Sequence, residues 1–292
     1  MTPRRIVASV IVCLGDLVED IVVRTAGEVC RGSDTAARVT RRLGGSAANV
    51  AVSVVQAGGE ARFVGAIGND AVGESLESAL RNDGVDVQLQ RAANARTGCI
   101  IVLVSPDGER SFLSDRGAAI HLDAPIAHYF KGATHLHVPL YSWQGEPLAS
   151  TTWSAVARAH ERCLTISVDC SSHAVMDDFG PLWLHTWLER VRPSVIFANE
   201  TENERLSSTA VSLAMRVVKR GSSPVQVFMP GTSTAMTVAV PVLDNVGDTT
   251  GAGDAFAGGF LASWCNGADP RAATVEGIAA SRRLLAGTRP TL

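Results

Sequence analysis

The sequence is poor in lysine and has no paired cysteine motif, and each shortage excludes a class of site. Its 292 residues include two lysines, and neither lies in the Gly-Lys-Ser/Thr setting of a Walker A phosphate loop. The six cysteines are scattered, without a CxxC pair or another metal-ligand spacing. A nucleophile elbow of the form GxSxG is also missing. We therefore expect a reduced, cytoplasmic protein that is neither a P-loop enzyme nor a serine hydrolase of that type.

An excess of positive charge and long apolar runs are also missing. The formal net charge of -3 gives no general attraction to nucleic acid or to an anionic membrane, so we expect small-molecule partners. No stretch approaches the roughly 18 apolar residues of a membrane span. The start, MTPRRIVASVIVCLGD, resembles a signal peptide, but its apolar run is short and lacks a cleavage site. We interpret it as a buried first strand.

The remaining pattern predicts an α/β fold. With 46% hydrophobic and 19% charged residues the chain can bury a substantial core, and we expect one domain over residues 1–292. Short β-branched runs alternate with helically spaced segments, which indicates a mainly parallel sheet flanked by helices. The predicted strands cover 5–14, 61–68, 134–140, 164–169, 194–199 and 225–229; helical patterns cover 47–58, 71–84 and 148–163.

Two regions interrupt this alternation. Residues 20–42 and 96–116 contain strand-like pieces of alternating polarity with no helix between them. We expect hairpins that stand off the main sheet and cover a site.

The glycine-rich stretch DTTGAGDAFAGGF, residues 248–260, carries the chemistry. Apolar residues at helical spacing after it predict a helix that starts near Asp254. Gly251, Ala252 and Gly253 then lie at the helix N-terminus, where free amides and the helix dipole favour an anion such as phosphate. Asp254 would repel that phosphate unless a hydroxyl lies between them whose proton the carboxylate accepts. This combination predicts a kinase; the alternative is a helix cap beside a tight turn.

Three motifs then resemble one family. DTTGAGDAF, the stretch 44–86 that begins GGSAANVAVSV, and ANETEN at 198–203 resemble the signatures of ribokinase-like, or PfkB-type, carbohydrate kinases. The resemblance covers nearly the whole chain. It implies a ribokinase-like fold, ATP and Mg²⁺ as co-substrate and cofactor, and a small β-strand lid made by the two off-sheet regions.

The resemblance also implies site residues. Asp20, five residues after Gly15, would hold sugar hydroxyls, with Gly44, Gly45 and Asn49 also at the acceptor. Asn199 and Glu202 would organise Mg²⁺ and its waters, and Gly231 would lie near the nucleotide. Asp248 matches a position that in many relatives helps to bind a monovalent cation such as K⁺. A homodimer through the lid is a further expectation.

Departures from the family pattern concern the nucleotide and the substrate. Met229 and Pro230 precede Gly231 where a Thr-x-Gly-x-x-Gly turn is usual, and Ser46 replaces the lysine that ribokinase carries. Ribose is therefore not the first expectation. We predict a kinase for a sugar or sugar acid; a nucleoside kinase of the same fold and a sugar-binding relative without catalysis remain alternatives.

The sequence alone leaves the roles of several other residues open. His135 and His137 share a strand face but lack a third metal ligand nearby in the sequence. Trp183 and Trp187 are expected to pack a helix. Arg110 and Arg116 face either a charged substrate or solvent.

Overall fold

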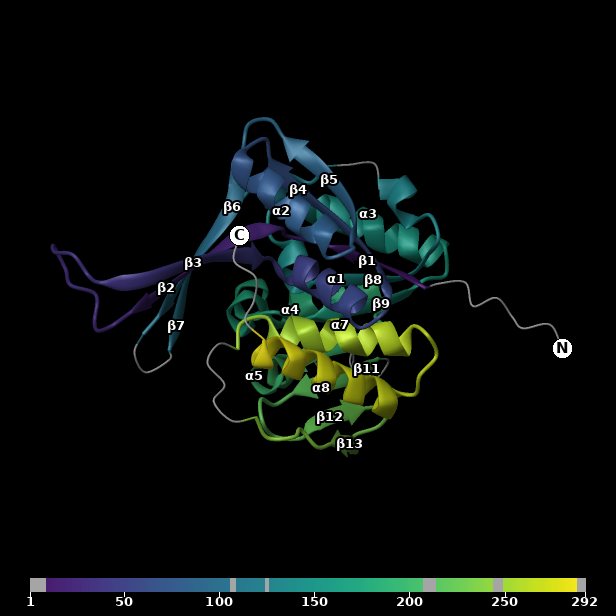
Figure 1. Ribbon diagram of the computed structural model, residues 1–292. Coiled ribbons are helices and arrows are strands. Elements are labelled where there is room, and N and C mark those ends of the chain that lie inside the picture. The colour runs from purple at the N-terminus through teal and green to yellow at the C-terminus, as the bar shows by residue number, and fades with distance from the viewer. Residues whose placement is uncertain (1–8, 106–108, 124–125, 207–213, 244–248, 288–292) are drawn as a thin grey trace.

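The fold is built on a nine-stranded sheet that is parallel over most of its width. The computed structural model describes residues 9–105, 109–123, 126–206, 214–243 and 249–287 (Figure 1). The strand order is β13-β12-β11-β10-β9-β8-β1-β4-β5, with β12 and β13 antiparallel to their neighbours. These strands are β1 Val10–Leu14, β4 Glu60–Gly68, β5 Asp86–Ala92, β8 Ala133–Pro139, β9 Thr165–Asp169, β10 Val195–Asn199, β11 Met215–Lys219, β12 Val225–Phe228 and β13 Ala235–Val238.

Helices cover both faces of this sheet. The helices are α1 Ser46–Gln56, α2 Ala71–Asn82, α3 Leu148–Glu161, α4 His173–Val191, α5 Glu200–Arg205, α7 Ala252–Trp264 and α8 Pro270–Ala286, with short 3₁₀ turns at Ala118–His121, Ile126–Phe130 and Leu140–Trp143. Alternate residues of the strands point to opposite faces. Ile11 and Cys13 join one core with α1, α2, α7 and α8, whereas Val12 and Leu14 join a second core with α3 and α4. The predicted α/β architecture is confirmed.

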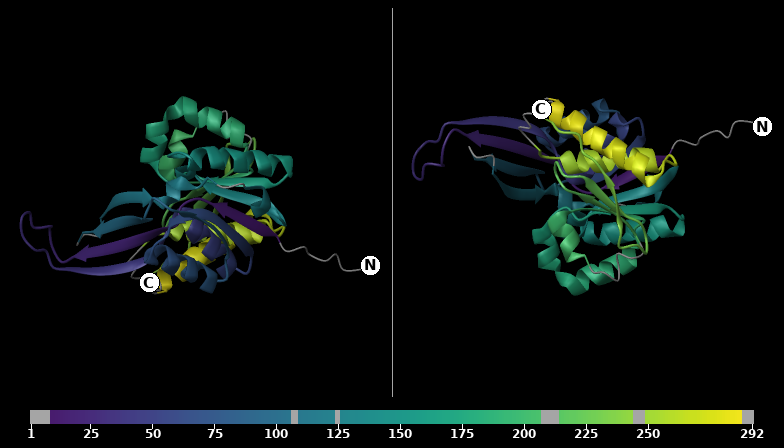
Figure 2. Two further views of the ribbon diagram at one scale, coloured as in Figure 1. Left: turned by 90° about the horizontal axis from the view of Figure 1, so that it is seen from above. Right: turned by 90° about the horizontal axis from the view of Figure 1, so that it is seen from below.

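A separate four-stranded sheet forms the lid. Its order is β3-β2-β6-β7, from β2 Val18–Thr25, β3 Ala37–Gly44, β6 Thr97–Val104 and β7 Arg110–Gly117. The two predicted hairpin regions are present, and a parallel pairing of β2 with β6 joins them into one sheet. Figures 1 and 2 show this sheet projecting from one side of the helix-covered body.

The sequence interpretation omitted three strands. β5, β11 and β13 are absent from the predicted set, although the other six strands overlap their predicted ranges. β5 reads DVQLQRA, in which only two apolar residues, Val87 and Leu89, alternate with polar ones, and β13 has four residues, so both apolar patterns are short. β11 reads MRVVK, and only a short turn separates it from β12, which was predicted.

The two histidines of β8 and the two tryptophans of α4 have packing roles. His135 and His137 are fully buried, and both bond the hydroxyl of Ser167, at 2.7 and 2.8 Å. Burial lowers the pKa of His135 to about 3 and that of His137 to about 4, so both are neutral at neutral pH. The described residues contain no cluster of three or more metal-ligating side chains. Trp183 and Trp187 stack within α4, as expected. Within the described ranges, no helix combines the length and apolar character of a membrane span.

Two glycines let α7 lie between its neighbouring helices. A Cβ added at Gly258 would lie 2.4 Å from the Ser53 Cβ of α1, and one added at Gly259 would lie 2.6 Å from the Ala280 Cβ of α8. Both distances are shorter than real contacts between carbon atoms, so only glycine permits this separation of the helices.

We predict that Gly258→Ala lowers the free energy of unfolding by about 1 to 3 kcal/mol, because the added methyl group overpacks the contact between α1 and α7. Gly27→Ala is the matched control, since nothing lies within 4 Å of a Cβ added there. Urea unfolding of both variants measures the effect. Equal stability of the two variants would contradict this account of the helix packing.

Candidate active site

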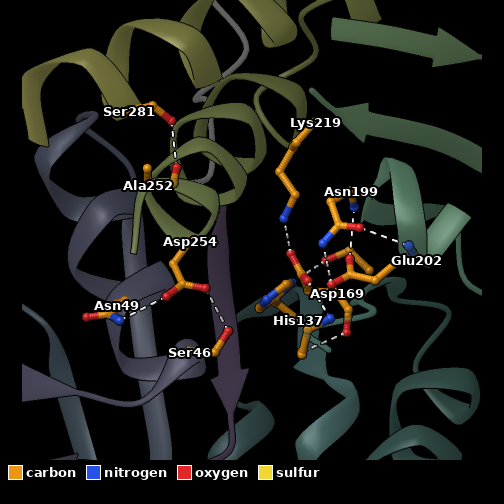
Figure 3. Close-up of polar contacts among 12 residues, drawn as sticks. Ser46, Asn49, His137, Asp169, Asn199, Glu202, Lys219, Ala252, Asp254 and Ser281 are labelled. Carbon is orange, nitrogen blue, oxygen red and sulfur yellow. Dashed lines mark hydrogen bonds and ion pairs between the residues drawn. The ribbon is translucent and has the colours of Figure 1, made fainter. Parts of the chain in front are cut away.

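The candidate site lies where several parallel strands end. Asp169 ends β9, Asn199 ends β10 and Lys219 ends β11, so their side chains meet at the carboxyl edge of the sheet (Figure 3). The N-termini of α1 and α7 reach the same edge and bring Asn49 and Asp254. In α/β proteins this edge is the usual place of ligand binding.

Asp254 is held by two side chains of α1. Its Oδ1 accepts a hydrogen bond from the Ser46 hydroxyl at 2.8 Å, and its Oδ2 accepts one from the Asn49 amide at 2.9 Å. Asp254 occupies the third position of α7, which begins at Ala252 and confirms the predicted helix start. Sequence analysis had placed Asn49 at the acceptor without connecting it to Asp254, and had not given Ser46 a role.

The electrostatic surroundings make the Asp254 carboxylate more basic. Burial raises its pKa above the ordinary value, and the nearby carboxylate of Asp169 raises it further. The hydrogen bonds from Asn49 and Ser46 and the charge of Lys219 act in the opposite direction, but burial dominates. A carboxylate in this setting is suited to accept a proton.

The turn before Asp254, residues 251–253, has the backbone form of an anion site, and we call it the anion turn. Gly251 caps α7 with φ of 71°, a left-handed conformation that favours glycine. The Ala252 amide donates to the Thr249 carbonyl at 3.1 Å, so one of the three amides expected to bind phosphate already has an internal partner. Ser281 of α8 donates to the Ala252 carbonyl at 2.6 Å and fixes the first turn of α7 (Figure 3).

An ion pair missed by sequence analysis lies beside this turn. The Lys219 ammonium donates to the Asp169 carboxylate at 2.7 Å, and both side chains are largely buried, with 18% and 5% exposed. Burial alone would lower the pKa of Lys219, but Asp169 and Glu202 raise it above its usual range. The only available signal was that Lys219 is one of two lysines and follows a β-branched run.

Asn199 and Glu202 form a reciprocal cap at the start of α5. Glu202 accepts hydrogen bonds from the Asn199 backbone and side-chain amides, and its own amide donates to Asn199 Oδ1, each at 2.8 Å. Burial and the charge of Asp169 raise the pKa of Glu202. Each Glu202 oxygen retains a second lone pair. The pair therefore fits hydrogen bonding to the waters of a Mg²⁺ ion, which keeps several waters, better than it fits direct ligation.

The expected acceptor residues lie close together. A Cβ added at Gly44 would meet the Asp20 carboxylate at 2.1 Å, and one added at Gly45 would meet the Asp16 carbonyl at 2.2 Å. Gly45 has φ of 102° and directly precedes α1. Glycine is therefore needed at position 45, where the backbone before β2 lies against the start of α1, whereas a side chain at position 44 would displace the Asp20 carboxylate.

Two lid arginines reach the body. Arg110 of β7 donates to the hydroxyls of Thr249 and Thr250, next to the anion turn. Arg116 pairs with both oxygens of Asp16, at 2.7 and 2.8 Å, and donates to the Tyr141 and Gln144 carbonyls. Neither side chain simply faces solvent.

A cavity of about 380 Å³ adjoins the anion turn. Its lining comes from the β11–β12 turn, from 240–243 and from α7 and α8, and includes Lys219, Gly221, Val242, Gly253 and Arg282. Gly231 lies in the later β12–β13 turn and is not among the lining residues, so its assignment to the nucleotide stays a prediction. Asp248, the expected cation residue, lies outside the described residues.

Comparison with known proteins shows the family. Residues 9–282 match the model of the pfkB family carbohydrate kinases, and the chain belongs to this family. A fructokinase of Vibrio alginolyticus is 30% identical over 243 residues, which cover 77% of this chain and 78% of that protein. The protein is therefore a carbohydrate kinase.

Solved structures agree with this fold. Adenosine kinase from Sinorhizobium meliloti superposes with a TM-score of 0.84 at 22% identity, covering 97% of this chain and 96% of that one. A candidate ribokinase II from E. coli in complex with ATP and Mg²⁺ superposes with a TM-score of 0.82 at 22% identity, covering 97% and 94%. The predicted ribokinase-like fold is confirmed.

Proposed function

We propose that the protein transfers the γ-phosphoryl group of ATP to a hydroxyl of a sugar or sugar acid, with Asp254 as general base. The observation that carries this proposal is the position of Asp254: it follows the anion turn directly and is oriented by Ser46 and Asn49 of the helix that begins at the acceptor glycines. The fructokinase similarity supports a sugar as acceptor.

In the proposed reaction the acceptor hydroxyl lies between Asp254 and the γ-phosphorus. The carboxylate takes the hydroxyl proton while the oxygen–phosphorus bond forms and the bond from phosphorus to the β,γ-bridging oxygen breaks, which leaves that electron pair on ADP. The amides of Gly251 and Gly253 donate to the transferring group, and that of Ala252 joins them when its bond to Thr249 opens. Bound Mg²⁺ would neutralise phosphate charge, with Asn199 and Glu202 bonding its waters. A K⁺ requirement through Asp248 remains part of the proposal.

Asp254→Asn should lower kcat by about 10²- to 10⁴-fold, because an amide cannot accept the proton. The measurement is ADP release with a panel of sugars, sugar acids and nucleosides. Exposed Asp123 provides the control substitution Asp123→Asn. A kcat for Asp254→Asn within threefold of the wild type would remove Asp254 from the mechanism.

Asp20 is proposed to hold acceptor hydroxyls. Asp20→Ala should raise KM for the true acceptor by roughly one to two decades, since a charged hydrogen bond contributes about 1.5 to 3 kcal/mol, and should leave nucleotide affinity unchanged. Asp34→Ala, on the exposed β2–β3 connection, makes the same charge change on the lid and should have no effect. Hydrogen exchange in β2 and β7 should slow when the acceptor binds. An unaltered KM together with unchanged exchange would place the acceptor elsewhere.

The lid also suggests a homodimer. Its edge strands carry exposed apolar side chains, Val39 on β3 and Phe112 and Leu113 on β7, each more than half exposed. We expect light scattering to give twice the 30.6 kDa chain mass, and Leu113→Asp to give the monomer mass. A wild-type monomer at assay concentration would rule this dimer out.

The six free cysteines fit a reducing, cytoplasmic setting.

A further inference from the structure

Lys219 places a positive charge inside a site otherwise rich in carboxylates. Its side chain starts at the end of β11 and reaches Asp169 at the end of β9. Strand β10 lies between these two strands in the sheet. Asp169, Glu202 and Asp254 all act electrostatically on Lys219. The triphosphate of the nucleotide would be repelled by three such carboxylates unless a cation lies among them.

The Lys219 ammonium also lies next to the anion turn. A Cβ added at Gly253 would be 3.1 Å from Nζ, so the space directly over this glycine is within hydrogen-bond reach of the ammonium. Lys219 and Gly253 both line the 380 Å³ cavity. An anion bound to the Gly253 amide from that cavity would therefore meet the ammonium as well.

A purely structural role explains the pair poorly. Buried ion pairs contribute little net stability, because the desolvation of both charges offsets their attraction. A lysine in such a position is more readily understood when a ligand uses the charge. Asp169 is itself fixed by the Ser171 amide at 2.8 Å, so it can hold the ammonium in one orientation.

We propose that Lys219 is a further catalytic residue, whose ammonium donates a hydrogen bond to an oxygen of the transferring phosphoryl group beside Gly253, and that Asp169 positions it. This inference rests on the proposed phosphoryl transfer. Lys219 keeps its proton throughout: the acceptor proton goes to Asp254, and the electron pair of the broken bond goes to ADP. The ammonium stabilises the charge on the phosphoryl oxygens during transfer.

The first experiment compares nucleotide affinities without any acceptor. Calorimetry measures Kd for ADP and for a non-hydrolysable ATP analogue in wild type, Lys219→Met and Lys219→Arg. Lys219→Met should weaken the analogue by on the order of tenfold to a hundredfold and leave ADP unchanged, because only the γ-phosphate contacts the ammonium. Lys219→Arg should recover part of the loss. Lys131→Met, at the chain's other and exposed lysine, is the matched control.

A double variant separates catalysis from folding. Lys219→Met leaves the Asp169 carboxylate buried without its partner, whereas Lys219→Met combined with Asp169→Asn removes both charges. We expect the double variant to melt near the wild-type temperature and still to lose about 10²- to 10³-fold in kcat, with KM for the sugar within threefold.

The assignment is overturned if the double variant keeps the wild-type discrimination between analogue and ADP, or if its kcat is within threefold of wild type. Turnover by the wild type and by Asp254→Asn judges the proposed function separately. The affinity ratio needs no acceptor, so the role of Lys219 is decided even when no sugar in the panel is phosphorylated.

Discussion

The hydrogen bonds from Ser46 and Asn49 to Asp254 depend on how closely α1 approaches α7. Gly258 lets the two helices touch where a methyl group would overlap Ser53, and this contact lies one helical turn below Asp254. The carboxylate thus receives its orientation from a helix about 200 residues earlier in the chain. Because only Gly45 separates α1 from Gly44, the last residue of lid strand β3, the same contact connects the lid to the turn before Asp254.

The site combines like charges that would be unfavourable in isolation. Burial raises the pKa of Glu202 and of Asp254, and the charge of Asp169 raises both further. Lys219 opposes both shifts, and the cap between Asn199 and Glu202 satisfies the buried carboxylate. Such an arrangement is unfavourable without ligands and becomes useful when a nucleotide with its counterions enters, which is common at catalytic sites.

The lid is connected to the body at both ends of β7. Arg116 anchors the base of that strand to Asp16, and Arg110 reaches the Thr249–Thr250 segment before the anion turn. The arrangement allows the lid position to influence the turn that is proposed to hold phosphate. Strand β2 of the same sheet carries Asp20, so the lid contributes both the residue proposed to hold the acceptor and the arginine beside the turn proposed to hold phosphate.

Local sequence patterns were sufficient for the α/β class, the kinase family and the first turn of α7, because these depend on apolar periodicity, glycines beside Asp254 and short signature motifs. They also located the lid segments, since strands of alternating polarity without a helix stand out locally. Which side chains meet in the site depends instead on the tertiary structure. Lys219 and Asp169 are 50 residues apart, and Ser46 and Asp254 are 208 apart, so no local pattern links them. The cavity beside Gly253 was likewise beyond sequence reasoning, because one of its walls is the turn after β11, whose five residues carry too weak an alternation to be recognised until they pair with β10.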